Sequence, residues 1–414
     1  MAASPARRAA FDILLRVDEG AFADELLHGP ALERLEVRDR ALATELTLGV
    51  LRWRGALDAL AAAPARRPVE SLDREVRAAL RLGAYQLRYL SRIPDRAAVS
   101  ESVELLKAGP KAAAAGLVNA VLRRLPPRPP AAREIEAANP AWLLQRWRQR
   151  HGAEAARAIL EAYQQQPSTF LRFNARFPYD ETVRLLEAEG VKAVPSGLPG
   201  AYRLEEGRPS ETRCWAEGRV RIQDLGSQRI APMLRPEAGK TLLDLCAAPG
   251  GKTQHAVELR GSAAGVFACD LYRHRLRTLN DLAAEPVPVV ALDAEKPLPF
   301  RRRFDQILID APCSGTGTLA RNPEIKWRLR PADLLDLQKR QREILRQGLA
   351  ALAPGGALVY ATCSIEPEEN EQVVETVLRQ TGGFRITQRL ERLPGRDAGD
   401  GFFAFRIEPI PSGA

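Results

Sequence analysis

From Ser4 to Leu125, apolar side chains recur at intervals of three and four positions, as in RAAFDILLRV, DRALATELTLGVLRW and REVRAALRLGAYQLRYL. This spacing collects the apolar side chains on one face of a helix. It predicts an all-α domain of about five helices over residues 1–130. The domain is expected to end at PPRPP, residues 126–130, because a run of prolines removes the hydrogen bonds that a helix needs.

The pattern becomes mixed in the middle of the chain. PAWLLQRWRQRHGAEAARAILEAYQQQ keeps the helical period, whereas residues 169–223 break into shorter pieces. Among these, TFLRFNAR and VRIQD are typical of strands and YDETVRLLEAEG of a helix, with Gly/Pro turns between them. We therefore expect residues 131–235 to form a helical linker and a small α+β module that binds RNA.

After Lys240, short apolar runs alternate with helical segments. The expected strands are TLLDL, GVFACD, VPVVALD, FDQILID, GALVYAT, FRITQ and FFAFRI, and helices separate the first five. Apolar strands joined by crossover helices form a parallel sheet that is covered on both faces. Residues 236–414 are thus predicted to be a doubly wound, Rossmann-like α/β domain, whose ligands bind at the carboxyl ends of the strands.

The composition agrees with a multidomain globular protein. Of 414 residues, 45% are hydrophobic and 27% charged, which excludes a disordered chain. The sequence contains no apolar run as long as a membrane span and no signal peptide at its start, so we expect a cytoplasmic location and no membrane partner. Five cysteines without a Cys-x-x-Cys pair, and only four histidines, predict no metal site.

The charge is uneven along the chain. The net charge is +9, and eight of these excess positive charges precede residue 241. A basic front half attached to a nearly neutral back half is typical of a polyanion-binding region joined to a domain with another task. An alternative is compositional bias, since 53 of the 61 basic residues are arginines.

The first strand of the α/β domain runs into Asp244-Leu-Cys-Ala-Ala-Pro-Gly-Gly-Lys-Thr253. Small residues there let backbone N–H groups at a helix N-terminus approach a ligand. The end of this string matches the phosphate-binding pattern G-x-x-x-x-G-K-[ST], and Asp310 could supply the acid that holds magnesium. A P-loop-like NTPase that acts on RNA is therefore one candidate, although Cys246 occupies the place of the first glycine.

Acidic residues at successive strand ends favour a different ligand. Asp270 ends the second strand, 26 residues after Asp244, near the offset of about 20 at which an acid binds ribose hydroxyls. Asp293 ends the third strand and could accept from an adenine amine. Acids around one pocket repel a triphosphate but suit a cofactor with a ribose and a sulfonium, which favours S-adenosylmethionine. Any one of them could instead simply end a strand in a turn.

Two cysteines follow the next two strands. Cys313 lies in DAPCSG and Cys363 in ATCS, 50 residues apart. Each alone is most simply a small apolar filler, but parallel strands would bring both to one sheet edge. Methylation at carbon 5 of a cytosine or uracil needs a thiolate at carbon 6 and a base to remove the carbon-5 proton. Asp310, if protonated, could hydrogen-bond ring nitrogen 3.

These residues also resemble a known family. DLCAAPGGKT, Asp270, Asp293, DAPCSGTG, RNPEIKW and ATCS resemble, in order and spacing, the RNA (cytosine-5) methyltransferases of the NOL1/NOP2/Sun group. The helical front segment, through VNAVLRRL, looks like a NusB-type RNA-binding domain, a combination found in the Sun/Fmu branch of the family. The resemblance implies methylation of small-subunit (16S) ribosomal RNA to 5-methylcytosine, a role in ribosome biogenesis.

The resemblance also implies roles for single residues. Cys363 is the implied nucleophile and Cys313 the group that aids product release, although DNA cytosine methyltransferases attack with the cysteine of a Pro-Cys motif, here Cys313. The residues implied to bind S-adenosylmethionine are Cys246, Ala247, Ala248, Pro249, Gly250, Gly251, Lys252, Asp270, Asp293 and Asp310.

A basic strip, RNPEIKWRLR, follows the Cys313 loop. A solvated surface turn is its plain interpretation. Beside a flipped base, Arg321, Lys326 and Arg328 would instead contact phosphate, and Trp327 would pack or stack. We expect a monomer that acts on ribosomal RNA; the alternatives are the NTPase and a non-catalytic RNA-binding protein.

Overall fold

The computed structural model describes residues 3–128 and 131–411. The chain divides into two compact units. The helical unit contains residues 1–166 and 319–328, and the α/β unit contains residues 167–318 and 329–414. Pro129 and Pro130 of the expected linker lie outside the described residues.

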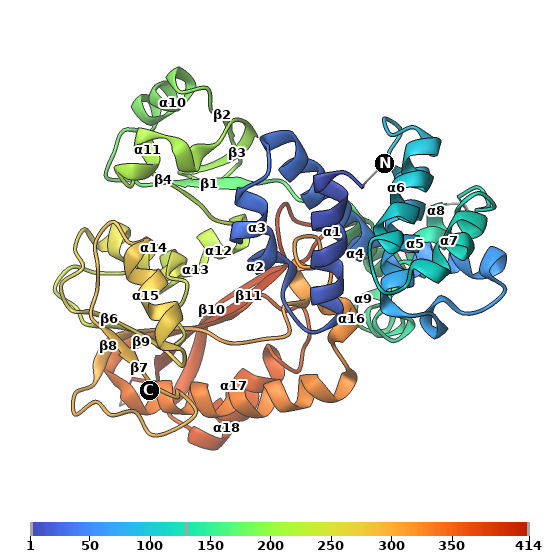
Figure 1. The fold of residues 1–414 in the computed structure, drawn as a ribbon. Coiled ribbons are helices and arrows are strands. Elements are labelled where there is room, and N and C mark those ends of the chain that lie inside the picture. Colours follow the sequence, from blue (N-terminus) through green and yellow to red (C-terminus); the bar gives the residue numbers. More distant parts are fainter. Residues whose placement is uncertain (1–2, 129–130, 412–414) are drawn as a thin grey trace. The chain divides into compact units, whose positions relative to one another are not determined.

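The helical unit confirms the predicted all-α fold of the front segment (Figure 1). Its apolar faces meet in one core, to which Leu46, Leu57, Leu80 and Leu82 contribute fully buried side chains. Small residues let the helices approach closely. At Gly49 an added Cβ would lie 2.1 Å from the Tyr85 ring. The helices are α1 (Pro5–Asp18), α2 (Ala23–Leu27), α3 (Pro30–Glu33), α4 (Val37–Ala65), α5 (Arg74–Tyr89), α6 (Asp95–Lys107), α7 (Ala115–Leu122), α8 (Ala131–Ala137) and α9 (Ala141–Gln164).

One short segment joins the helical unit from far along the chain. Residues 319–328, which include α16 (Ile325–Arg328), follow directly on the Cys313 loop but pack with the helices. The helices α8 and α9 also accompany this unit, whereas the sequence grouped them with the small middle module. Among the described residues, no helix has both the length and the apolar character to cross a membrane.

The small module of the α/β unit is a four-stranded antiparallel sheet in the order β2-β3-β1-β4. Strand β1 (Phe170–Phe173), helix α10 (Tyr179–Ala188) and strand β4 (Val220–Ile222) lie where the sequence predicts them. The hairpin of β2 (Lys192–Pro195) and β3 (Ala201–Glu206) was not predicted, because its sequence reads as Gly/Pro turns. Helices α11 (Arg213–Ala216), α12 (Leu225–Gln228) and α13 (Ile230–Leu234) lead on to the large sheet.

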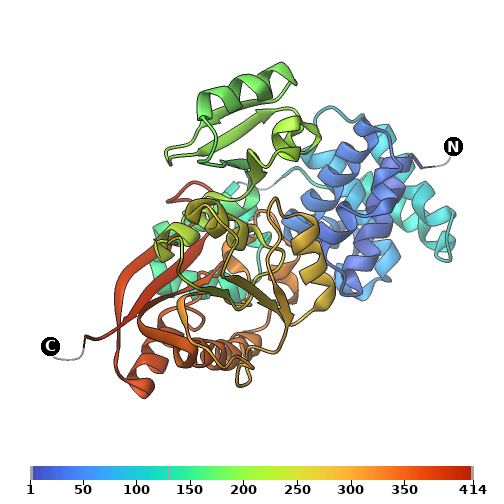
Figure 2. The same cartoon turned by 90° about the vertical axis from the view of Figure 1, so that its left-hand side faces the viewer.

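The large sheet has the order β10-β11-β9-β8-β5-β6-β7. Five strands are parallel, as expected, and β10 and β11 complete one edge in antiparallel pairing, shown in red in Figure 2. The strand order reverses between β5 and β8, so ligands are expected beside their carboxyl ends. The strands are β5 (Leu242–Asp244), β6 (Val266–Asp270), β7 (Val289–Ala291), β8 (Phe304–Asp310), β9 (Leu352–Thr362), β10 (Phe384–Arg392) and β11 (Phe402–Pro409).

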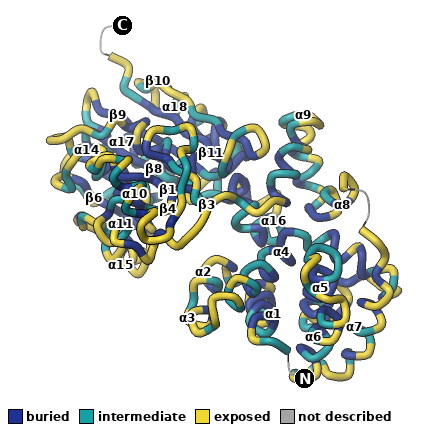
Figure 3. The backbone as a smooth tube through the Cα atoms, turned by 90° about the horizontal axis from the view of Figure 1, so that it is seen from above, coloured by how far each residue is buried: buried dark blue, intermediate teal, exposed yellow. Residues whose placement is uncertain are grey.

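Alternate residues of each central strand enter two separate cores. Leu243 and Ile307 belong to the core under α17 and α18, whereas Leu242 and Leu308 belong to the core under α13, α14 and α15. Successive residues of a strand therefore point to opposite faces of the sheet, and both faces are buried, which is why neighbouring positions such as Leu242 and Leu243 are both apolar. In Figure 3 strands β8, β9 and β11 are largely dark blue, as expected for strands buried on both faces, whereas the edge strands β7 and β10 are mostly intermediate or exposed. The covering helices are α14 (Gly251–Arg260), α15 (Arg273–Asp281), α17 (Pro331–Ala351) and α18 (Glu371–Thr381).

The close approach at Gly49 can be tested by substitution. Gly49→Ala should destabilise the helical unit by about 1–3 kcal/mol, because the new methyl group overlaps the Tyr85 ring and forces repacking. Gly116→Ala in α7 is the matched control. Nothing lies within 4 Å of its added Cβ, so that alanine should stabilise the helix by about 0.5–1 kcal/mol. Urea unfolding of both variants measures the difference, and equal effects would contradict the packing argument.

Candidate active site

The loop after β5 is shaped by a buried carboxylate. Asp244 is fully buried and accepts hydrogen bonds from Thr253 Oγ1 at 2.7 Å and from the Cys246 backbone N–H at 3.3 Å. Burial raises the pKa of Asp244 to about 7. Because both of its oxygens face the loop and helix α14, Asp244 holds the loop in place.

Two further acids hold the other strand ends. Asp270 accepts from the backbone N–H of Ala248 at 3.3 Å and of Tyr272 at 3.0 Å. Asp293 accepts from the backbone N–H of Glu295 at 3.0 Å. Each aspartate therefore orders the turn after its own or the neighbouring strand and also lines the pocket at the strand ends.

The lysine of the loop is paired with the acid that ends β8. Lys252 Nζ lies 2.6 Å from Asp310 Oδ2. Burial lowers the pKa of Lys252, but the charges of Asp310 and Cys363 raise it, and the net pKa lies above its ordinary value. The ammonium thus already has a carboxylate partner, unlike a P-loop lysine, which serves phosphate.

The two thiols lie together at the ends of β8 and β9. The sulfur atoms of Cys313 and Cys363 are 3.4 Å apart. A hydrogen bond with Cys363, burial and the charge of Cys363 raise the pKa of Cys313 well above its ordinary value. Either sulfur can donate the hydrogen bond that joins the two side chains.

A buried glutamate, which the sequence analysis did not single out, connects the two cysteine loops. The Glu369 carboxylate accepts from the Ser314 N–H at 2.7 Å and from the hydroxyls of Ser314 and Ser364, the residues that follow the two cysteines. Gln341 Nε2 donates to the same carboxylate at 3.0 Å. Burial raises the pKa of Glu369 although these hydrogen bonds oppose it.

One pocket gathers most of the predicted site residues. The members that line it are Cys246, Ala248, Asp270, Asp293, Asp310, Cys313 and Cys363. The other predicted residues of this loop do not line the pocket: Ala247, Pro249 and Gly250 belong to the loop, and Gly251 and Lys252 to the first turn of α14. Four polar lining residues were missed, Tyr272, Arg275, Glu295 and Arg340. Tyr272 and Glu295 each follow a predicted aspartate by two positions, a spacing that could have indicated them.

The basic strip after the Cys313 loop is not a free RNA-facing surface. Lys326 is 1% exposed, and its Nζ donates to Arg52 O at 2.9 Å and to Asn139 Oδ1 at 3.0 Å. Burial and the charge of Arg52 lower its pKa well below the ordinary value. The expected phosphate contact of Lys326 does not fit this burial.

The neighbours of Lys326 are also engaged within the helical unit. Trp327 Nε1 donates to Leu51 O at 2.9 Å, and Arg328 donates to Val17 O at 2.7 Å. Arg321 is half-buried in the same segment. The hydrogen bonds of Trp327 and Arg328 attach the strip to α1 and α4. These two side chains therefore bind backbone carbonyls of the protein, whereas the sequence suggested that they contact RNA.

Among the described residues there is no cluster of His, Cys, Asp and Glu that could hold a metal ion.

A doubly wound sheet, with an acid-lined pocket and two thiols at its switch point, defines a Rossmann-like methyltransferase domain. Comparison with known families agrees. Residues 231–408 match the 16S rRNA methyltransferase RsmB/F family, residues 4–126 the NusB family, and residues 139–211 the ferredoxin-like domain of RsmF/B-like methyltransferases.

Whole-length relatives give the same result. The chain is 36% identical to ribosomal RNA small subunit methyltransferase B of Salmonella paratyphi A, over 94% of this chain and 95% of the relative, and 36% identical to that of Salmonella enteritidis, over 96% and 97%. The crystal structure of PH0851 has the same fold, with a TM-score of 0.84, 23% identity and 99% coverage of both chains. The chain belongs to the 16S rRNA methyltransferase RsmB/F family and is a ribosomal RNA methyltransferase.

The role of Glu369 can be separated from general stability. Glu369→Gln puts an amide N–H₂ or a weaker acceptor against the donors of Ser314 and Gln341, so the cysteine loops should shift. We expect kcat for methyl transfer to fall on the order of 100-fold, as for a misplacement of about 1 Å, with cofactor affinity unchanged.

Glu368→Gln, which makes the same charge change one residue earlier at a half-buried position, is the control. Single-turnover methyl transfer and calorimetry with S-adenosylhomocysteine measure the two quantities. An equal loss in both variants, or a loss of cofactor affinity in Glu369→Gln, would contradict a positioning role.

Proposed function

We propose that this protein uses S-adenosylmethionine to methylate carbon 5 of a cytosine in 16S ribosomal RNA, through a covalent bond between Cys363 and carbon 6. The observation that carries the proposal is the pair of thiols 3.4 Å apart at the edge of the strand-end pocket. Methylation of oxygen or nitrogen needs no thiol nucleophile, whereas carbon 5 of cytosine becomes nucleophilic only after addition at carbon 6.

The chemistry of the pocket suits the cofactor. The carboxylates of Asp270 and Asp293 can accept hydrogen bonds from ribose hydroxyls and from an adenine amine, and Leu271 and Leu292 offer apolar contact to a base. When bound, S-adenosylmethionine supplies an electrophilic methyl group on a sulfonium. Cys246 and Ala248 line the pocket on its loop side, and Asp244 fixes that loop from behind.

Cys363 forms the first bond of the reaction. As a thiolate it adds to carbon 6 of cytosine, and the ring electrons move to carbon 5, which then takes the methyl group. Lys252 lies close enough for its charge to interact with Cys363, and this ammonium attracts a thiolate. The Lys252–Asp310 pair, 2.6 Å apart, presents both a donor and an acceptor to the cytosine edge, including nitrogen 3. We expected a protonated Asp310 in this role; beside the ammonium, a carboxylate with Lys252 as donor is the better assignment.

Cys313 completes the reaction. With Cys363 bonded to carbon 6, the thiolate charge that helps to raise the pKa of Cys313 is gone, and Cys313 releases its own proton to solvent. Its thiolate then accepts the carbon-5 proton, the electrons of that C–H bond restore the ring double bond, and the bond from carbon 6 to Cys363 breaks with Cys363 leaving as a thiolate. The raised pKa of Cys313 makes this thiolate a strong base.

The proposal also includes a cytoplasmic location and a monomeric state for this protein.

The order of the two cysteines can be tested with single variants. Cys363→Ala should abolish turnover and leave no covalent adduct, because no bond to carbon 6 forms. Cys313→Ala should still attack and transfer methyl but then stall, leaving RNA attached to the protein in a denaturing gel. RNA that contains 5-fluorocytosine traps the wild-type adduct as a positive control, since fluorine cannot leave as a proton.

The opposite order predicts the opposite gel. An adduct formed by Cys363→Ala would overturn the assignment of the nucleophile. If the Cys313→Ala enzyme turns over normally, Cys313 has only a packing role, and another base or water removes the carbon-5 proton. Cys269→Ala, which removes a buried thiol of the same sheet that does not line the pocket, controls for the loss of a thiol as such.

The cofactor class can be tested against the NTPase alternative. Calorimetry should detect binding of S-adenosylhomocysteine and not of ATP, because Lys252 is already paired and the pocket is acidic. ATP binding without S-adenosylhomocysteine binding would reverse the proposal, and binding of neither would favour a non-catalytic RNA-binding protein. Bisulfite sequencing of 16S ribosomal RNA, with and without the protein, then identifies the modified cytosine.

A further inference from the structure

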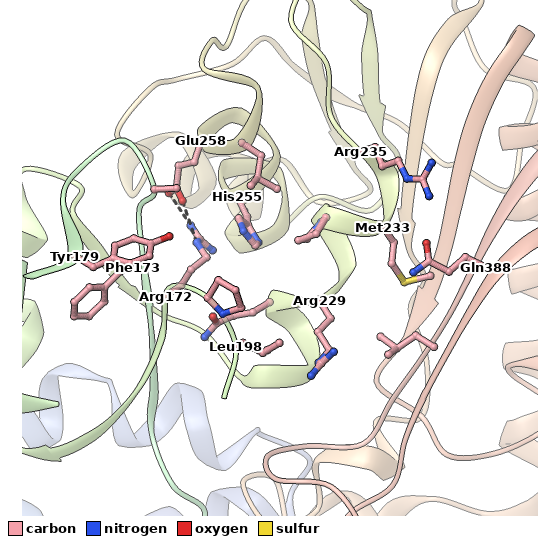
Figure 4. Close-up of a pocket in the computed structure, with 16 residues that line it drawn as sticks. Arg172, Phe173, Tyr179, Leu198, Arg229, Met233, Arg235, His255, Glu258 and Gln388 are labelled. Carbon is pink, nitrogen blue, oxygen red and sulfur yellow. Dashed lines mark hydrogen bonds and ion pairs between the residues drawn. The ribbon is translucent and has the colours of Figure 1, made fainter. Parts of the chain in front are cut away.

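A second cavity lies within the α/β unit, between the small module and helix α14 (Figure 4). Its volume is about 520 Å³, more than twice the roughly 240 Å³ of the strand-end pocket, and the two share no lining residue. Cavities of about 300–1,000 Å³ are typical of sites for small organic groups. Its lining residues come from β1, α10, α12, α13, α14 and β10, together with the turns that adjoin them.

The arginines of this cavity differ in their pairing. The Arg172 guanidinium is engaged by protein, since it binds Glu258 with two hydrogen bonds of 2.7 and 3.0 Å and donates to Gly251 O at 3.1 Å. Arg229 and Arg235 also line the cavity, and among the described residues neither guanidinium has a hydrogen bond or an ion pair; the Nε of Arg229 is in addition buried without an acceptor. Two positive charges are thus available for an anion.

A neutral polar group accompanies these charges. His255 is only 8% exposed, and its Nδ1 is buried without a hydrogen-bond partner in the described chain. Burial and the charge of Arg172 lower the pKa of His255 well below its ordinary value, so the imidazole is neutral. Figure 4 shows it beside the Arg172–Glu258 pair. A buried imidazole nitrogen without a hydrogen-bond partner lowers the stability of the folded protein, and a ligand that supplies the hydrogen bond removes this cost.

We propose that this cavity binds one unpaired nucleotide of the substrate RNA, distinct from the target cytosine. Arg229 and Arg235, whose guanidinium groups point apart in Figure 4, bind the two phosphates that flank the nucleotide, one each. His255 hydrogen-bonds the edge of its base, with Tyr179, Leu198 and Met233 as further lining. The inference rests on the proposed function only in that RNA is the substrate. Since the edges and faces of a base become accessible when it is unstacked, the nucleotide belongs to a single-stranded loop or end and not to a duplex.

The experiment compares RNA affinity in variants of the full chain. Arg229→Gln/Arg235→Gln should weaken binding of single-stranded RNA, measured by fluorescence anisotropy, on the order of 10-fold, and reduce the salt slope by about 1.4, for two lost phosphate contacts. Arg385→Gln/Arg379→Gln, which removes two charges from residues that do not line the cavity, is the control and should change the affinity by less than about 2-fold. S-adenosylhomocysteine affinity should stay the same in all variants.

The base contact has its own test. Binding of short homopolymeric RNAs should show a preference for one base in the wild type, and His255→Phe, which keeps a flat ring without the nitrogen, should remove it. Unchanged RNA affinity in the double arginine variant overturns the proposal, as does an equal loss in the control. If the wild type binds free ribonucleoside monophosphates but the double arginine variant keeps its RNA affinity, the cavity is a site for a small anion and the proposal is wrong.

The readouts separate this inference from the proposed function. None of them requires turnover, so a protein that fails to methylate cytosine but loses RNA affinity in the arginine variants retains the cavity as an RNA site. If the protein methylates cytosine normally and the arginine variants keep their RNA affinity, the cavity is not an RNA site, and the proposed reaction is unaffected.

Discussion

The structure depends on one buried carboxylate that holds two loops in register. Cys313 and Cys363 follow different strands and are 50 residues apart in the sequence, yet their sulfur atoms lie 3.4 Å apart. Glu369 links the two loops by accepting hydrogen bonds from the residue after each cysteine. Because the carboxylate is buried, its geometry is fixed by these donors and not by solvent, and an unsatisfied carboxylate there would be costly.

Near Glu369, the charged groups of the site are paired with other charges or with backbone N–H groups before any ligand binds. Lys252 and Asp310 form a pair across the switch point, and Asp270 is held by backbone N–H groups of its own turn and of the loop after β5. Such preorganisation reduces the reorganisation that the protein must undergo when charge develops on the substrate. It also explains why a lysine that resembles a phosphate ligand in sequence has another partner in space.

The parts of the fold predicted from sequence are those that local patterns determine. Strands β5 and β8 contain runs of consecutive apolar residues because neighbours such as Leu242 and Leu243 enter opposite cores, and these runs are visible in the sequence. The β2–β3 hairpin was not predicted because its short strands are joined by a segment rich in glycine and proline, which favour turns. Glu369 was missed because it lies in EPEEN, where acids look solvated. Lys326 was placed at the surface because nothing local shows that Arg52 O, 274 residues away in the chain, accepts from its ammonium. Burial of polar residues depends on tertiary partners, and the sequence alone does not reveal them.

The membership of residues 319–328 in the helical unit makes the front domain inseparable from the catalytic chain. A truncation that begins at the α/β unit would retain this decapeptide but remove Leu51 and Arg52, whose carbonyls accept from Trp327 and Lys326. It would expose an indole and leave an ammonium without its acceptors, immediately downstream of the Cys313 loop. Grafting a different RNA-binding domain onto this enzyme would therefore require exchange of the decapeptide as well. The two segments would have to be inherited together, although residues 167–318 separate them in the sequence.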